Sequence, residues 1–136
     1  MAGGSLPEDE LAQVDAVGLA ALIRDGQLSP VEAVQATIDR IERLDGEINA
    51  VIHRQFDQAL ALAASPDLPD GPFRGVPILI KDLWATEAGQ PHHGGVQALK
   101  DAGFTADEDA NLVTRYKEAG FVIVVRTNTP ELGLVA

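Results

Sequence analysis

The chain has 136 residues, of which 46% are hydrophobic and 23% charged, and this balance predicts one globular domain with a real core. The net charge is −11 and only ten lysines and arginines are present, so direct binding to DNA or RNA is not expected. No apolar run approaches the ~20 residues that cross a bilayer. The absence of cysteine excludes disulfides, thiolate metal sites and a thiol nucleophile.

The first five residues (Met-Ala-Gly-Gly-Ser) lack the positive cluster and the apolar core of a signal peptide. We therefore expect a loose end or an expression remnant there, and a cytoplasmic protein by default. The acidic excess is uneven, because residues 1–80 hold 5 basic and 13 acidic side chains while residues 81–136 hold 5 and 8. This distribution indicates a solvated acidic surface on the N-terminal helices.

Two helices are predicted in the first third of the chain. Asp15 can cap the first helix, and Gly26 can stop it. Ser29 and Glu32 have the spacing of a capping box, which predicts the start of the second helix. Gly46 is expected to end that helix, and we expect the two helices to form an antiparallel pair.

The domain organisation follows from this pattern. We expect a loose terminus over residues 1–10, a helical pair over 11–46, and the beginning of an α/β core over 47–136. Alternating apolar residues predict a short strand at 48–52. A further helix is predicted at 56–64, before a proline-rich loop.

Residues 75–82 (Gly-Val-Pro-Ile-Leu-Ile-Lys-Asp) hold three consecutive aliphatic side chains followed by a lysine. The run predicts a short buried strand, in which Pro77 is tolerated only at the beginning. A lysine where a strand leaves the core is costly unless it is paired or used. Burial disfavours the ammonium form and lowers the pKa of a lysine, as a catalytic base requires. Lys81 is therefore a candidate catalytic residue.

A strand, a crossover helix and a second strand are predicted in the C-terminal part. A long loop rich in glycine and proline covers 86–95, and a helix is expected at 107–119 with Leu112 facing inward. The continuous apolar run 121–125 predicts a strand covered on both faces. The unit is then parallel and right-handed, which places Lys81 at the carboxyl end of its strand, where open parallel sheets bind ligands.

The last residues open a further element, which Thr129 can cap, and they end on an apolar run. A two-stranded parallel sheet with exposed edges is not expected to stand alone. We therefore expect a fragment, or a partner chain that completes the sheet.

Two motifs carry a resemblance to a known family. Residues 75–82 resemble the strand that bears the catalytic lysine in the amidase signature family. Residues 126–133 (Arg-Thr-Asn-Thr-Pro-Glu-Leu-Gly) resemble the next landmark of that family, which also follows a helix and an apolar strand. The resemblance spans about residues 10–136. It implies an α/β fold in which N-terminal helices precede a partial mixed, mostly parallel sheet flanked by helices.

The resemblance also implies amide hydrolysis through a Ser–Ser–Lys triad, of which only Lys81 is matched here. In that family a neutral lysine takes a proton from a bridging serine, which activates the nucleophilic serine that forms an acyl-enzyme. Both family serines lie beyond the second motif, whereas Ser5, Ser29 and Ser65 all precede Lys81. The 136-residue chain alone is therefore expected to be inactive.

One segment departs from the family pattern. After Gly89 many members carry two small hydroxyl residues and then Gly-Ser, where this chain has Pro-His-His-Gly-Gly. The departure concerns the substrate pocket and not the lysine. His92 and His93 are interpreted as loop packing or a pocket wall rather than metal ligands, because adjacent side chains in an extended loop point apart. Gly94 and the glycine after it could form an anion nest, but no nucleotide-binding motif is present.

Five further residues are interpreted as local contributors. Asp82 is expected to be a hydrogen-bond or ion-pair partner, and His53 a structural residue. Thr127 and Asn128 are expected to hold the turn after the strand. Trp84 either walls the active site or covers the core, and the sequence leaves both interpretations open.

The predicted function is that of an amidase acting on carbon–nitrogen bonds other than peptide bonds, in a small-molecule amide substrate. No cofactor, metal, nucleic acid or membrane partner is expected. Two alternatives stay open: an amidotransferase subunit of the same fold that supplies ammonia within a complex, and a non-catalytic module that associates through the sheet edge. A homodimer is an alternative to a completing chain segment.

Overall fold

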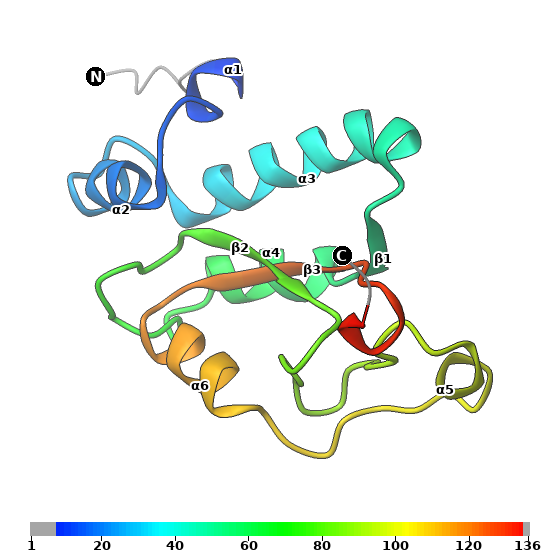
Figure 1. Cartoon of the computed structure of the whole chain (residues 1–136). Coiled ribbons are helices and arrows are strands. Elements are labelled where there is room, and N and C mark those ends of the chain that lie inside the picture. The colour runs from blue at the N-terminus through cyan, green and yellow to red at the C-terminus, as the bar shows by residue number, and fades with distance from the viewer. Residues whose placement is uncertain (1–7, 135–136) are drawn as a thin grey trace.

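The computed structural model describes residues 8–134, so most of the expected loose terminus lies outside the described residues. Helices and a small mixed sheet share the fold (Figure 1). The elements in chain order are α1 (Glu8–Leu11), α2 (Ala16–Arg24), α3 (Pro30–Ile48), β1 (Val51–Arg54), α4 (Phe56–Ala64), β2 (Pro77–Lys81), α5 (Gln97–Asp101), α6 (Asn111–Glu118), β3 (Val122–Thr127) and the 3-10 turn η1 (Glu131–Gly133). Within residues 8–134, none of the helices has the length and apolar character needed to cross a membrane.

Side-chain caps confirm the two predicted helix starts. The Asp15 carboxylate accepts a hydrogen bond from the Gly18 N–H at 2.8 Å. The Ser29 hydroxyl accepts one from the Glu32 N–H at 3.1 Å, and the Glu32 carboxylate accepts one from the Ser29 N–H at 2.8 Å. This reciprocal capping box satisfies two backbone donors at the start of α3.

The predicted end of α3 at Gly46 is wrong, because the helix continues to Ile48. Asn49 then adopts the left-handed conformation, with φ at 54°. The Asp45 carboxylate accepts hydrogen bonds at 2.8 and 3.0 Å from two backbone N–H groups that follow Asn49. Asparagine can take the left-handed position that ends a helix, so the helix ends at this side-chain cap and the following strand starts later than predicted.

The sheet has the order β1-β3-β2, with β3 in the centre. β2 runs parallel to β3, which confirms the predicted parallel pairing, and β1 pairs antiparallel with β3. The sheet is therefore mixed. Because β2 and β3 are parallel, their carboxyl ends meet at one end of the sheet, where Lys81 lies.

Helices cover both faces of β3, and α3 and α6 lie on opposite sides of the sheet (Figure 1). The central strand is fully apolar over residues 122–125, and none of these side chains is more than 6% exposed. The cluster under α3 and α4 contains Val34, Ile38, Ile41, Ala59, Ala63, Leu68, Val122, Val124 and Val125. The cluster under α6 contains Ile80, Ala85, Val113 and Ile123. The prediction of a strand covered on both faces is confirmed.

The expected antiparallel pairing of α2 with α3 is wrong. Figure 1 shows α2 nearly end-on where α3 runs across the view, so the two helices cross. The apolar stripe of α3 is already buried against α4 and β3, which leaves only its first turns for α2. A separate small cluster joins them: Leu11, Leu19, Leu22, Ile23, Leu28, Ala33 and Ala36.

The crossover helix α6 starts at Asn111, four residues after the predicted start. The acidic segment before it does not form a helical turn, because Asp109 is engaged elsewhere. Its carboxylate accepts hydrogen bonds from a backbone N–H of the preceding loop at 2.8 Å and from Lys117 Nζ at 2.9 Å. The prediction that Leu112 faces inward is also wrong, since it is 48% exposed while Val113 is fully buried.

Candidate active site at the carboxyl end of the sheet

Lys81 is the last residue of β2, and β3 holds its backbone in place. Lys81 pairs with Thr127 in the parallel register. The Asp82 N–H donates to the Thr127 carbonyl at 2.9 Å, and the Thr127 hydroxyl donates to the Ile80 carbonyl at 3.4 Å. The residues on both sides of Lys81 are thus tied to the neighbouring strand.

The Lys81 side chain is exposed in the described structure, so the described residues alone do not bury its amine. Alternation along the strand puts Leu79, which is 43% exposed, on the same face as Lys81. Ile80 points to the opposite face and packs under α6. Because α3 and α4 cover β3 and leave Leu79 and Lys81 uncovered, the amine keeps its contact with water.

The Asp82 side chain, unlike that of Lys81, is buried and only 1% exposed. Its two carboxylate oxygens accept hydrogen bonds from the His93 N–H at 3.1 and 3.2 Å. Oδ1 also lies 3.7 Å from Arg126 Nη1. The predicted role of Asp82 as a local hydrogen-bond and ion-pair partner is confirmed.

Arg126 is the cation at the centre of a buried cluster with Asp82 and His92. The sequence analysis gave Arg126 no role. It is 1% exposed, and Nη1 donates to the Ala85 carbonyl at 2.9 Å and to the Lys81 carbonyl at 3.4 Å. Burial lowers the pKa of Arg126, whereas the charges of Asp82 and Glu87 act to raise it. The available signal was its position directly after the apolar run of a central strand.

His92 completes the cluster. Its Nδ1 lies 3.2 Å from Arg126 Nη1 and 3.4 Å from Asp82 Oδ1. Burial lowers the pKa of His92 below its ordinary value; Asp82 acts to raise it, and Arg126 and His93 act to lower it. The loop-packing interpretation of His92 is confirmed. Within residues 8–134, no three or more His, Cys, Asp or Glu side chains are grouped as metal ligands would be.

A second polar group fixes the long loop that follows β2. Gln55 and Glu87 are 5% and 7% exposed, and the Gln55 amide donates to the Glu87 carboxylate at 2.8 Å. Lys117 Nζ lies 3.5 Å from the same carboxylate. His53 Nε2 lies 3.0 Å from Gln90 Oε1, so His53 has the structural role predicted for it.

Glycines and an exposed tryptophan flank this region. Gly94 accepts a hydrogen bond from the Leu132 N–H at 2.8 Å, and a Cβ on Gly95 would lie 2.9 Å from the Thr129 carbonyl. The two glycines therefore permit close packing of the loop against η1. Trp84 is 80% exposed, so it does not cover the core of the described residues.

The turn after β3 is held by Asn128, as predicted. Its side-chain oxygen accepts a hydrogen bond from the Thr129 N–H at 2.9 Å, and its N–H donates to the Ala50 carbonyl at 2.7 Å. The predicted cap at Thr129 is wrong. Pro130 occupies the N-cap position of η1, and the Thr129 hydroxyl donates to the Pro130 carbonyl at 3.2 Å.

Two of the cavities among the described residues lie on different parts of the molecule. One of about 500 Å³ opens between β1 and the loop that carries α5, and Asp82, His93, Lys100 and Arg126 are among its lining residues. This cavity adjoins the buried cluster, and these four side chains give it a polar wall.

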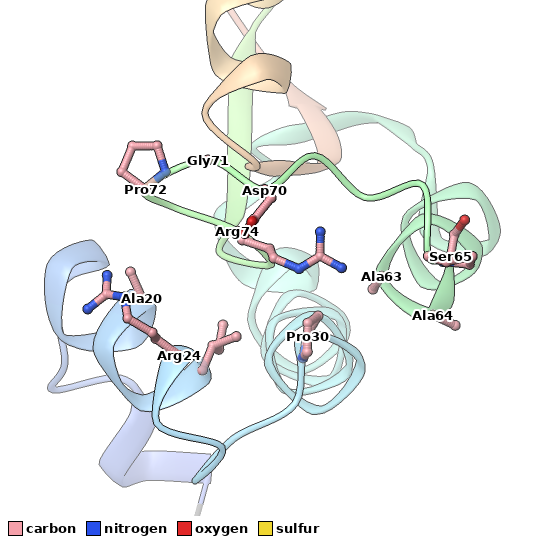
Figure 2. Close-up of a pocket in the computed structure, with 12 residues that line it drawn as sticks. Ala20, Arg24, Pro30, Ala63, Ala64, Ser65, Asp70, Gly71, Pro72 and Arg74 are labelled. Atoms are coloured by element: carbon pink, nitrogen blue, oxygen red, sulfur yellow. The ribbon is translucent and has the colours of Figure 1, made fainter.

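The larger cavity, about 640 Å³, is lined by Arg24 of α2, Pro30 of α3, Ala63 of α4 and Arg74 of the loop before β2, among others. Figure 2 shows the Arg74 side chain extending toward α4, while the Arg24 guanidinium points away from Arg74. Arg74 also donates to the Leu68 carbonyl. The two cations therefore do not converge on one anion, and neither Lys81 nor the Asp82–His92–Arg126 cluster lines this cavity.

The model of the family described as Amidase matches residues 32–136. The chain belongs to the amidase signature family. It is 41% identical over 119 residues to the 6-aminohexanoate-cyclic-dimer hydrolase of Paenarthrobacter ureafaciens, covering 88% of this chain and 24% of that protein. It is 36% identical over 131 residues to a glutamyl-tRNA(Gln) amidotransferase subunit of Thermobifida fusca, covering 92% of this chain and 26% of that protein.

Solved structures agree with this family membership. The structure of 6-aminohexanoate cyclic dimer hydrolase superposes with a TM-score of 0.81 at 40% identity, over 88% of this chain and 24% of that one. A bacterial aryl acylamidase described as an amidase signature enzyme gives a TM-score of 0.79 at 34% identity, over 88% and 26%. The chain thus spans about a quarter of the length of the relatives that it matches.

Proposed function

We propose that this chain is the N-terminal portion of an amide hydrolase, and that Lys81 is its catalytic proton acceptor. The observation that carries the proposal is the position of Lys81. It ends the strand whose sequence resembles the lysine-bearing strand of the family, and its backbone is fixed by Thr127 and Arg126 while its amine stays free of the core. Hydrolase relatives at 40–41% identity support amide hydrolysis.

The proposed chemistry needs two serines from polypeptide outside the 136 residues. The amine of Lys81 takes a proton from the bridging serine, which takes one from the nucleophilic serine as its oxygen attacks the amide carbonyl. The C–N bond breaks, the amine leaves with a proton, and water then hydrolyses the acyl-enzyme. Ser29 caps α3, and the Ser65 hydroxyl accepts a hydrogen bond from the Asp67 N–H at 3.0 Å. Ser5 lies outside the described residues.

The uncovered face of β2 fits a site that is shared between this chain and further polypeptide. A proton acceptor has to be neutral near neutral pH, and withdrawal from water favours the neutral form of an amine. Further polypeptide packed over Leu79 and Lys81 would supply that low-dielectric environment. The chain then contributes an anchored lysine, and the added part contributes both the cover and the serines.

A chimera tests this proposal. The chain replaces the matching N-terminal quarter of the 6-aminohexanoate-cyclic-dimer hydrolase of Paenarthrobacter ureafaciens, and hydrolysis of the cyclic dimer is measured. We expect turnover by the chimera and none by the 136-residue chain alone. Turnover by the isolated chain, or a folded chimera without turnover beside an active parent hydrolase, would contradict the proposal.

A role within an amidotransferase complex is the second candidate function, and the similarity to glutamyl-tRNA(Gln) amidotransferase subunits at 34–36% identity favours it. The distinguishing experiment joins this chain to the remainder of the matching Thermobifida fusca subunit. Amide hydrolysis that appears only when the other members of that complex are added would support the second candidate. Equal hydrolysis with and without them would favour the independent hydrolase.

A further inference from the structure

His92 occupies the segment in which the chain departs from the family pattern, and it reaches the support of Lys81. The Arg126 Nη1 that it contacts is the same nitrogen that donates to the Lys81 and Ala85 carbonyls. Asp82 follows Lys81 directly, and its Oδ1 lies within 4 Å of both Arg126 Nη1 and His92 Nδ1. A change at His92 can therefore reach the end of β2 through one hydrogen-bonded nitrogen.

The neighbours of His92 Nδ1 decide which protonation state fits. Arg126 Nη1 has only donors and lies 3.2 Å away, whereas the Asp82 oxygen is at 3.4 Å. One Nη1 hydrogen points to the Ala85 carbonyl at 2.9 Å. The second is shared between His92 Nδ1 and the Lys81 carbonyl. An unprotonated Nδ1 accepts this hydrogen bond, and the ring proton then lies on Nε2.

We propose that neutral His92 is a positioning residue, which holds the Arg126 guanidinium against the carboxyl end of β2 and so fixes Lys81. The inference rests on the proposed function only in giving Lys81 a catalytic role. Protonation of His92 turns Nδ1 into a donor, which cannot accept from Arg126 and turns to Asp82 instead. The guanidinium then loses an acceptor and gains a cationic neighbour, so the end of β2 loosens in acid.

Three charged or titratable groups face the imidazole: Asp82 from the end of β2, Arg126 from β3, and His93 from its own loop. Glu87 acts on Arg126 from the loop after β2. Burial is the largest influence and lowers the pKa of His92, so the folded chain keeps the ring neutral to lower pH than the unfolded chain does. The acceptor is therefore in place at neutral pH.

The test uses the 136-residue chain labelled with ¹⁵N-histidine, followed by NMR between about pH 4.5 and 8. The proposal predicts that neutral His92 carries its proton on Nε2 and titrates below the ordinary histidine range. It also predicts that the Lys81 carbonyl carbon and the Asp82 amide shift with the midpoint of His92. A proton on Nδ1 in the neutral ring, or Lys81 and Asp82 signals that do not follow His92, would overturn the proposal.

Three variants separate positioning from packing. His92→Asn keeps an acceptor near the place of Nδ1 but cannot be protonated, so the Lys81 and Asp82 signals should stay at their high-pH positions in acid. His92→Leu removes the acceptor and should speed exchange of the Asp82 N–H about tenfold or more. His93→Asn is the matched control and should leave the shared titration of His92, Lys81 and Asp82 in place, although it removes one charge that lowers the pKa of His92.

Two results for the His92→Asn chain would contradict the proposal. One is a Lys81 carbonyl signal that still shifts with pH as in the unmodified chain, and the other is an Asp82 N–H that exchanges as fast as in the His92→Leu chain. If His92→Leu does not fold, the unmodified chain and the His92→Asn variant still decide the question. None of these measurements depends on turnover, so their failure leaves the proposed amide hydrolysis untouched, and an inactive chimera leaves the positioning role untouched.

Discussion

Lys81 and Asp82 are neighbours in the sequence but lie in opposite environments. Asp82 is 1% exposed and is held by His93, His92 and Arg126. Lys81 is exposed on the face of β2 that α3 and α4 leave open. The difference teaches that these 136 residues build the support beneath the proposed proton acceptor, while the cover above it is not among the described residues.

Removing the cation beneath the site should have the largest effect on stability. Arg126→Met leaves the buried Asp82 carboxylate without its arginine partner, and loss of one member of a buried ion pair costs about 3–5 kcal/mol. Urea denaturation followed by circular dichroism measures this loss in the 136-residue chain. Arg115→Met, on the exposed face of α6, is the matched control and should stay within about 0.5 kcal/mol of the unmodified chain.

The double variant Arg126→Met, Asp82→Leu sharpens the same comparison. Because both buried charges are then gone, it should recover at least about 1 kcal/mol relative to Arg126→Met alone. A loss below about 1 kcal/mol for Arg126→Met would show that the buried cluster does not support the sheet as described.

The two faces of the sheet should also respond differently to truncation. Val124→Ala removes methyl groups from a fully buried side chain and should cost about 2 kcal/mol. Leu79→Ala on the open face should cost less than about 1 kcal/mol, although it removes more atoms. Equal losses in urea denaturation would mean that the open face is covered in solution, for example in a dimer.

The pH dependence of stability probes the buried side alone. The pKa of His92 is lowered on folding, so the unfolded chain binds the proton more readily. The free energy of unfolding should therefore rise with pH through the window below an ordinary histidine pKa of about 6.5. As the pH falls, the contribution of neutral His92 to stability should be lost completely once the pH is below the folded-state pKa. Urea midpoints for the unmodified chain and for His92→Asn should diverge as the pH falls through that window. Parallel curves would contradict the pKa shift.

The smallest expected effect is that of Lys81 on the stability of the chain alone. Lys81→Met changes an exposed side chain and should alter the free energy of unfolding by less than about 0.5 kcal/mol. A loss comparable to that of Arg126→Met would show that Lys81 supports the fold and is not held free for chemistry.

Local signals predicted much of this fold. The cap at Asp15 and the capping box at Ser29 gave both helix starts, and the apolar run ending at residue 125 gave the central strand. Helix ends were less accurate, because a side-chain cap by Asp45 displaced the stop expected at Gly46.

The buried part of the site could not be read from local patterns. The Asp82–His92–Arg126 cluster joins residues 10 to 44 positions apart, and only the tertiary fold brings them together. The strand pattern likewise did not determine whether Lys81 is buried or exposed. An apolar strand pattern predicts which side chains have to be buried. It does not predict which helix or loop packs over each face of the strand.

The most direct measurement of the central claim is turnover of the cyclic dimer by the chimera with Lys81→Met, beside Arg115→Met as a control on the exposed face of α6. If Lys81 is the proton acceptor, the first variant should lose activity by a factor of about 10² to 10⁴ while its circular dichroism spectrum stays unchanged. The control should retain turnover within about twofold. Retained hydrolysis in a folded Lys81→Met chimera would remove Lys81 from the mechanism.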